Sequence, residues 1–180
     1  MTQTHLLILN KLGSFLKQGI AKIIARKTKL AIDRWSLSPV KTQDRVFKRL
    51  LKSAQNTKFG QDHNFSNVNS HKDFTDNIPI RDYEEFIPYI ELIKKGEKNI
   101  LWKGLPVYFA ITSGTTSGIK YIPITKESLP EHFNASKNAM LLYINETGKI
   151  DFLSGKLIFL QGSPVLDTNG VIKTGRLSGI

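Results

Sequence analysis

The chain has 180 residues, of which 40 % are apolar and 23 % are charged. These proportions are close to those of ordinary globular chains, so they exclude intrinsic disorder and a fibrous protein, and the length suits one domain or little more. The sequence contains no cysteine, which excludes disulfides, thiolate metal sites and a cysteine nucleophile.

The net charge of +11 is concentrated at the N-terminus. Residues 1–60 hold 13 Lys and Arg but only Asp33 and Asp44, whereas residues 61–180 hold 13 residues of each sign. A basic region of this kind is typical of a nucleic-acid- or membrane-surface-binding module, which is the alternative from another class of function. We expect no nucleic-acid partner, because the aromatic residues there have a helical spacing that suits a core better than a base-stacking platform.

The apolar runs are too short for a membrane protein. None reaches the roughly 18 residues of a membrane span, so we expect no integral membrane segment. The early run Leu6–Leu9 is also shorter than the core of a signal peptide. We therefore expect a cytoplasmic chain without a cleaved leader.

The first 56 residues are predicted to form a basic helical segment. Between His5 and Trp35, apolar residues recur every three or four positions, which is typical of a helical face packed on the rest of the protein. These residues are Leu9, Leu12, Phe15, Leu16, Ile20, Ile23, Ile24 and Leu30. A weak contact of this N-terminal helix with an anionic membrane surface is the alternative, because its other faces are rich in lysine.

A second helix is expected over residues 42–55, after a break at Pro39. Its inner face is predicted to consist of Val46, Phe47, Leu50, Leu51 and Ala54. Residues 56–77 are rich in polar and small residues, so they are expected to form a loop or short helices, anchored by Phe59, Phe65 and Phe74.

A further helix is predicted within Arg81–Gly96. Asp82 and Glu85 have the spacing of a capping box at its start. Pro88 is expected to bend or restart the helix, and Gly96 to end it.

The second half changes character. Val107–Thr112 and Tyr121–Ile124 are predicted to be strands joined by a loop. A helix capped by Thr125 or Ser128 is expected to follow and to end near Gly148, with inward residues that include Phe133, Ala139, Met140 and Leu141. A short buried strand is expected at Leu157–Leu160. A helical first half followed by strand, loop, strand, helix and strand predicts an α/β fold.

The loop between the two strands has the composition of a phosphate-binding loop. Such a loop needs glycines for close backbone approach and short hydroxyl side chains as donors. Gly114 and Gly118 meet the first need, Lys120 adds a compact positive charge, and the hydroxyl donors are Ser113, Thr115, Thr116 and Ser117. On composition alone, a flexible hairpin loop is the alternative. The spacing matches neither the P-loop nor the dinucleotide-binding turn.

The stretch Phe109–Lys120 resembles the AMP-binding signature of the adenylate-forming superfamily, which includes acyl-CoA synthetases, luciferases and adenylation domains. Together with Ile78–Glu91 upstream and Lys120–Pro123 after the loop, it is similar to the auxin-responsive-promoter family of acyl-acid amido synthetases. The resemblance covers roughly Thr57 to the C-terminus. It implies that residues 57–180 are the start of an ATP-binding large domain, preceded by the basic segment 1–56.

The resemblance implies an ATP-dependent ligase. In that family a carboxylate attacks the α-phosphorus of Mg-ATP to give an acyl-adenylate, and an amine, often that of an amino acid, then displaces AMP. The implied cofactors are ATP and Mg²⁺, and the implied partners are a small-molecule carboxylic acid and an amine. The implied ATP-binding residues are Ser113, Gly114, Thr115, Thr116, Ser117, Gly118 and Lys120.

Members of that family are much longer than this chain. The chain is therefore expected to be the N-terminal fragment of an enzyme and to have no synthetase activity by itself. Another adenylate-forming ligase, such as an acyl-CoA synthetase, is the alternative among enzymes, and it would use a thiol rather than an amine as the acceptor.

The histidines do not predict a metal centre. His63 and His71 lie eight residues apart near Asp62 and Asp73, which allows a metal cluster. Solvated loop residues explain them as well, and we expect that explanation to hold. His132 is expected at the surface of a helix.

Overall fold

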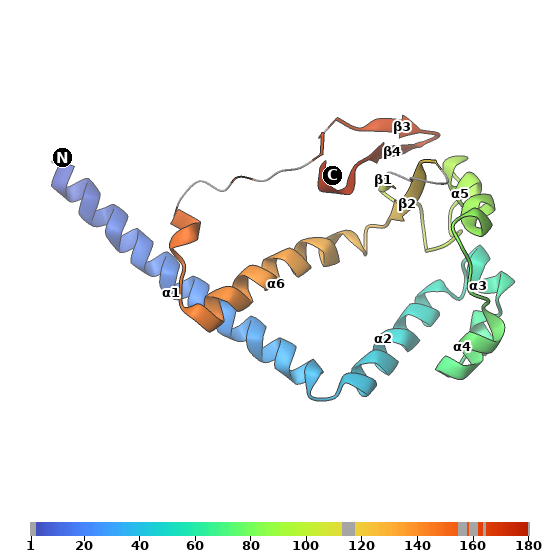
Figure 1. Ribbon diagram of the computed structural model, residues 1–180, viewed down its shortest axis with the longest axis horizontal. Helices are drawn as coiled ribbons and strands as arrows, with labels where there is room; N and C mark the ends of the chain where they lie inside the picture. Colours follow the sequence, from blue (N-terminus) through green and yellow to red (C-terminus); the bar gives the residue numbers. More distant parts are fainter. Residues whose placement is uncertain (1–2, 113–117, 155–157, 159–161, 164, 180) are drawn as a thin grey trace. The chain divides into compact units, whose positions relative to one another are not determined.

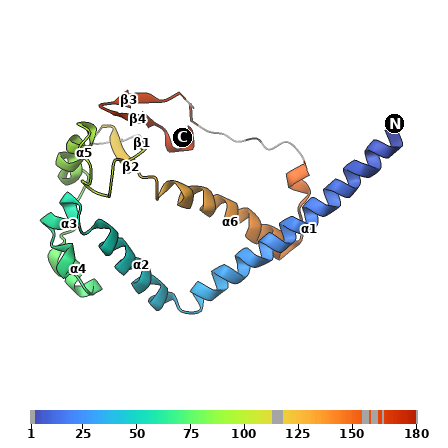
Figure 2. The same ribbon diagram turned by 180° about the vertical axis from the view of Figure 1, so that it is seen from behind.

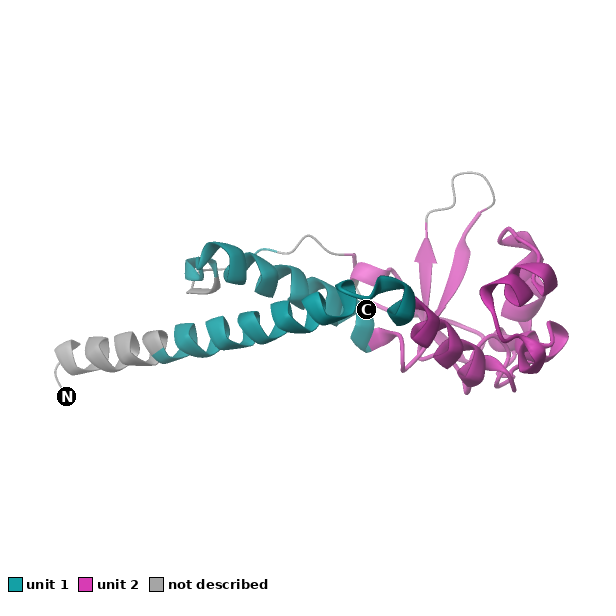
Figure 3. Ribbon diagram, turned by 90° about the horizontal axis from the view of Figure 1, so that it is seen from below, with its two compact units in different colours: residues 1–42, 130–159 teal, residues 43–129, 160–180 magenta. Residues whose placement is uncertain are grey.

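The computed structural model describes residues 3–112, 118–154, 158, 162–163 and 165–179, with side chains from Leu16 on except at residues 153, 154 and 179. The chain divides into two compact units (Figure 3). Unit 1 comprises residues 1–42 and 130–159, and unit 2 comprises residues 43–129 and 160–180. The domain boundary expected between residues 56 and 57 does not coincide with this division. The compact units do not test that boundary, so it stays a prediction.

Unit 1 is built on two helices. α1 spans Gln3–Ser36 and α6 spans Leu129–Thr147, followed by a 3-10 turn at Asp151–Ser154 (Figure 1). Thr125 and Ser128 exchange hydrogen bonds just before α6, and Gly148, with a φ of +67°, follows its end, as expected. None of the helices in the described part of the chain is long and apolar enough to span a membrane.

The two helices of unit 1 meet through small side chains. Ala25 is fully buried, and it packs with Ala21 of α1 and with Leu141 and Ile144 of α6. Small residues allow a second helix to approach closely, so the contact lies on this face of α1.

The apolar stripe that was expected to be buried on α1 is exposed wherever its side chains are described. Leu16, Ile20, Ile23, Ile24 and Leu30 are each between 46 and 60 % exposed. That expectation is therefore wrong for residues 16–30, because α6 packs on the alanine face. The side chains of Leu9, Leu12 and Phe15 lie outside the described residues.

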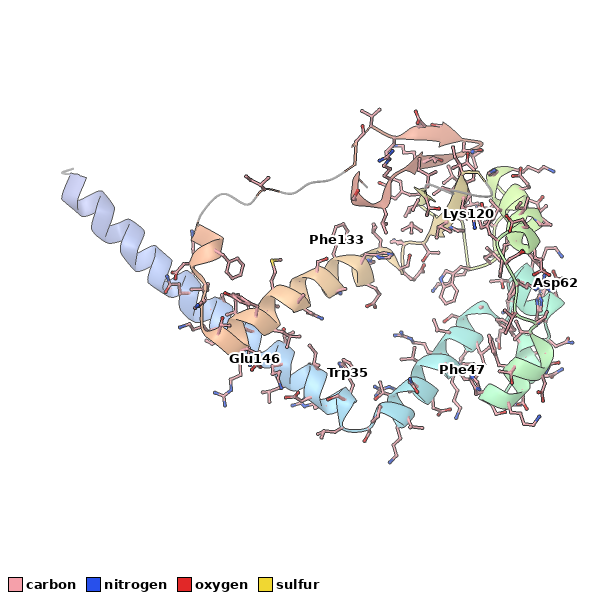
Figure 4. All side chains as sticks on the ribbon, in the orientation of Figure 1. Trp35, Phe47, Asp62, Lys120, Phe133 and Glu146 are labelled. Carbon is pink, nitrogen blue, oxygen red and sulfur yellow. The ribbon has the colours of Figure 1, made fainter. Side chains whose placement is uncertain are left out.

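The expected inner face of α6 is only partly correct. Leu141 is buried, but Phe133 is 62 % exposed and extends away from its helix (Figure 4), and Ala139 and Met140 are exposed as well. Ile144 takes the second inward position because residues three apart share one side of a helix.

α2 spans Pro39–Ala54 and begins with the proline that ends the first pattern. Leu51 and Ala54 are buried and Phe47 packs against them, as expected. Val46 and Leu50 are exposed, so the expected inner face is narrower than the apolar pattern suggests.

Short helical segments follow, at α3 (Lys58–Asp62), a 3-10 turn (Phe65–Asn67) and α4 (His71–Asn77). Phe65 is buried, and Phe59 and Phe74 pack against it, which confirms the aromatic anchors. Thr57 caps α3: its hydroxyl accepts a hydrogen bond from the N–H of Gly60 and donates one to the carbonyl of Ala54.

α5 spans Ile87–Lys94 and follows a 3-10 turn at Glu84–Phe86. Asp82 and Glu85 exchange backbone-to-carboxylate hydrogen bonds of 3.1 and 3.2 Å, which confirms the capping pair. Pro88 lies in the first turn of α5, where the missing N–H is tolerated, so the helix restarts there. Gly96, with a φ of +91°, follows the end of α5, as expected.

The strands of unit 2 form one mixed sheet in the order β2-β1-β4-β3. β1 (Tyr108–Thr112) is antiparallel to β2 (Lys120–Ile124) and parallel to β4 (Ile172–Gly175), which forms a hairpin with β3 (Asp167–Asn169). α5 lies beside this sheet in both views (Figure 1, Figure 2). The expected α/β fold and its first two strands are confirmed.

The C-terminal strands differ from expectation. Of the strand expected at Leu157–Leu160, the structure describes only Ile158, which is 95 % exposed and lies outside any strand. The β3–β4 hairpin was not expected, although Asn169-Gly170 is a strong hairpin signal. The structure shows the hairpin as part of the sheet, where β4 pairs with β1.

The turn of this hairpin provides a stability test. Gly170 has a φ of +64°, and a Cβ there would collide with the carbonyl of Lys94, whereas Gly104 has a φ of +75° and open space around it. Gly104→Ala should lower the free energy of unfolding by about 1 kcal/mol through the backbone alone. Gly170→Ala should lower it by about 2 kcal/mol more, because the collision adds to that strain. Urea unfolding measures both, and equal losses would contradict the close approach.

Candidate functional site

The hairpin of β1 and β2 carries the predicted phosphate-binding residues in its connection. The ladder runs from Tyr108 opposite Ile124 to Thr112 opposite Lys120, so the connecting residues leave and re-enter paired strands. The two predicted strands are thereby confirmed. Ser113, Gly114, Thr115, Thr116 and Ser117 lie outside the described residues, and their binding role stays a prediction.

Gly118 and Lys120 are the described members of the predicted site. Gly118 has a φ of +77°, a conformation that favours glycine, and no atom of the described residues lies within 4 Å of where a Cβ would be. Lys120 is half-buried and begins β2 (Figure 4), and its Nζ lies 5.4 Å from the centroid of the Tyr83 ring.

The Lys120 ammonium has no acidic partner among the ion pairs of the described residues. Other lysines are paired with carboxylates, namely Lys29, Lys48, Lys58, Lys72, Lys94 and Lys103, whereas Lys126, for example, has no such pair among the described residues either. An ammonium without a carboxylate partner can bind an anion such as a phosphate.

Tyr121 fixes the strand next to Lys120. Its ring packs edge-on against Phe109, at a centroid distance of 5.7 Å, and the Nζ of Lys94 lies 4.1 Å from its centroid. Lys94 is in turn paired with Glu91 at 2.7 Å. Because successive side chains of a strand point to opposite faces, Lys120 lies on the other face from this cluster.

His63 is buried, not solvated, and it links Phe59 to Arg81 through hydrogen bonds. It is 7 % exposed and stacks on Phe59, at a centroid distance of 4.1 Å. Its Nδ1 lies 2.8 Å from the carbonyl oxygen of Phe59, so Nδ1 donates, and Nε2 accepts from the Arg81 guanidinium at 2.9 Å. The expectation of a solvated residue is therefore wrong for His63, because both ring nitrogens have protein partners.

His71 and His132 are exposed, as expected. Among the described residues, no group of three or more His, Cys, Asp or Glu side chains is placed to hold a metal ion.

The sequence analysis missed Tyr83, whose ring contacts Lys120. The available signal was its place inside Ile78–Glu91, the upstream segment that carries the family resemblance. Spacing in the sequence could not show that this segment contacts Lys120, because Tyr83 and Lys120 are 37 residues apart.

Comparison with known proteins identifies the class of this fold. The chain matches the structure "AtGH3.15 acyl acid amido synthetase in complex with 2,4-DB" at 26 % identity with a TM-score of 0.61, over 73 % of this chain and 23 % of that chain. It matches a second structure, "GH3.15 acyl acid amido synthetase", at 22 % identity with a TM-score of 0.67, over 82 % of this chain and 26 % of that chain. The fold is thus that of part of an acyl acid amido synthetase.

The family assignment is direct. Residues 30–179 match the N-terminal domain of the GH3 family, and the chain belongs to this family. The match confirms the resemblance to acyl-acid amido synthetases and begins within α1, earlier than Thr57. The chain spans about a quarter of the length of the solved structures it matches. Among curated proteins, no match was found.

Asp62 provides a test of the packing between α3 and α5. Its carboxylate accepts hydrogen bonds from Lys58, at 3.0 Å, and from the Tyr89 hydroxyl, at 2.8 Å. The Lys58 hydrogen bond first, and the Tyr89 bond second, hold the pKa of Asp62 below its ordinary value. Lys58→Met should therefore raise the pKa of Asp62 more than Tyr89→Phe does, as measured by an NMR titration of the carboxyl carbon.

The sign of the linked stability follows from the lowered pKa. The stability that Asp62 contributes is present above its ordinary pKa of 3.8 and is lost as the pH falls through the folded-state value. An unchanged titration of Asp62 in both variants would contradict the two hydrogen bonds.

Proposed function

We propose that the β1–β2 hairpin binds the phosphates of ATP in an acyl-acid amido synthetase. The observation that carries the proposal is the Lys120 ammonium, which pairs with no carboxylate of the described residues and follows a loop of glycines and hydroxyl residues, within a chain of the GH3 family. The loop residues Ser113 to Ser117 are assigned to the same site on their composition and on the family resemblance.

The residues have distinct tasks in this proposal. Gly118 has no side chain to block phosphate oxygens from its N–H, and Lys120 supplies a positive charge that offsets the negative charge of the phosphates. Bound ATP would supply the adenylyl group: a carboxylate oxygen would bond to its α-phosphorus as pyrophosphate leaves, and an amine would then displace AMP from the acyl carbon. Charge that moves onto pyrophosphate during this step is stabilised by donors already in place.

Magnesium is assigned to the nucleotide rather than to a protein cage. Mg²⁺ keeps several waters and is commonly held by substrate phosphates together with one or two carboxylates. In this proposal the loop hydroxyls are candidate oxygen donors to the metal ion. Ser113, Thr115, Thr116 and Ser117 are of the required oxygen type.

The substrates that we propose are a small-molecule carboxylic acid and an amine, the latter often an amino acid. Support comes from the names of the matched structures, which are acyl acid amido synthetases, one of them bound to 2,4-DB. We assign the complete reaction to the full synthetase fold, in which the segment equivalent to this chain is about a quarter. The cytoplasmic location expected above is part of the same proposal.

A lysine exchange tests the phosphate site. Lys120→Ala should weaken ATP binding by about tenfold or more, because a hydrogen bond between charged partners is lost. Lys126→Ala is the matched control, since Lys126 is an exposed lysine shortly after the end of β2 and should leave the affinity unchanged. Isothermal titration of the chain with Mg-ATP measures both. Equal affinities for the Lys120 variant and the wild type would refute the role of this ammonium.

The loop hydroxyls are tested separately. Replacing Thr115 and Thr116 with valine keeps their shape and removes their donors, so ATP affinity should fall by about tenfold. Thr168→Val, on the exposed edge strand β3, is the control and should have no effect. If the double variant binds ATP as the wild type does, the loop does not hold the phosphates.

A further inference from the structure

Tyr83 contacts the hairpin at the point where the chain leaves the loop. Its phenol oxygen accepts a hydrogen bond of 2.7 Å from the backbone N–H of Tyr121. The face of the same ring lies under the Lys120 ammonium, 5.4 Å from Nζ to the ring centroid. A single side chain therefore contacts both the backbone and the charged group that follow Gly118.

The backbone contact is explained by the position of β2 in the sheet. β2 is an edge strand, so backbone groups that face away from β1 have no strand partner. The hydroxyl of Tyr83 provides a partner for the N–H of Tyr121. Removing the hydroxyl leaves a half-buried N–H without that partner, and the start of β2 loses a fixed point.

Tyr83 is itself held from both sides along the chain. The next turn is fixed by the reciprocal hydrogen bonds of Asp82 and Glu85. On the preceding side, Arg81 donates to the buried His63, which donates to the carbonyl of Phe59. The position of the Tyr83 ring is thus set by contacts that reach the core of unit 2, independently of the loop.

The contact with Lys120 orients the ammonium without neutralising it. The attraction between a cation and a ring face is weaker than a hydrogen bond between an ammonium and a phosphate. A carboxylate at this place would compete with the phosphate for the ammonium, whereas the ring leaves the charge available. The ring therefore restricts the lysine to one region and still permits it to bind a ligand.

We propose that Tyr83 is a positioning residue of the phosphate site: it holds Lys120 and the adjoining backbone of Tyr121 in place for the triphosphate of ATP. This inference rests on the function proposed for the hairpin and adds to it a residue from the upstream segment Ile78–Glu91. Tyr83 acts through Lys120 and Tyr121, so its effect on binding should depend on Lys120.

The experiment compares ATP affinity in a cycle of variants of the whole chain: Tyr83→Phe, Lys120→Ala and the two combined. Tyr83→Phe keeps the ring under Lys120 and removes the hydroxyl, and it should weaken Mg-ATP binding by about fivefold. In the Lys120→Ala background, the same exchange should weaken binding by less than about twofold, because the group that Tyr83 positions is already absent. Tyr83→Leu, which also removes the ring, should have the largest effect.

Tyr89→Phe is the matched control. It removes a phenol hydroxyl from the same region, but that hydroxyl donates to Asp62 and makes no contact with the hairpin among the contacts of the described residues. The ATP affinity of this variant should equal that of the wild type. Equal weakening by Tyr83→Phe and Tyr89→Phe would show a general loss of structure and overturn the proposal.

Hydrogen exchange provides a readout that does not depend on the ligand. The N–H of Tyr121 should exchange faster in Tyr83→Phe and at the wild-type rate in Tyr89→Phe. If the wild type binds ATP and Lys120→Ala weakens it while both Tyr83 variants bind normally, the positioning role is wrong and the phosphate site stands. If the wild type does not bind ATP, the function proposed for the hairpin fails, and the positioning role fails with it.

Discussion

The burial of the Phe109 ring is the contact on which the architecture of unit 2 depends. The side chain is fully buried, in a cluster with Ile90 and Ile93 of α5 and Ile172 of β4. These residues come from three distant parts of the chain, so the cluster joins a local helix to a sheet whose outer strands are far apart in sequence. β1, which carries Phe109, has strands on both sides, as β4 does, so its backbone is held by two neighbours. A loop that leaves such a strand begins from a fixed point.

The other end of the loop needs a different kind of support, because β2 is an edge strand. One side of β2 is held by the ladder with β1, and its outer side is held by side chains: Tyr83 at the backbone of Tyr121, and Lys94 over the Tyr121 ring. A lysine on an edge strand also discourages pairing with another chain, which is a structural explanation of Lys120 that needs no ligand. The phosphate-binding and the edge-protecting explanations of Lys120 differ in one respect: protection against pairing does not require the ammonium to lie over the Tyr83 ring.

The local elements were predictable where the sequence contains its own start and stop signals. Asp82 with Glu85, Pro88, Gly96 and Gly148 all act through hydrogen bonds or dihedral angles within a few residues, so their spacing is sufficient. Burial was less predictable, because it depends on which element packs against which face. The α1 stripe illustrates this: Leu16 and Ile20 have the apolar character of a core, but Ala21 and Ala25 allow the closer approach of α6. For the candidate site, composition identified Gly118 and Lys120, whereas Tyr83 required the three-dimensional contact.

The two segments that carry the family resemblance meet in space, although they are separated along the chain. Apart from its charged residues, Ile78–Glu91 contains no residue type that suggests phosphate binding. Its Tyr83 nevertheless contacts Lys120 and Tyr121, at the start of β2. A site that binds a highly charged ligand needs donors that are already in place, since reorientation at the moment of binding costs free energy. The segment from Arg81 to Glu85, fixed by His63 on one side and by its capping pair on the other, is placed to hold the described end of this site.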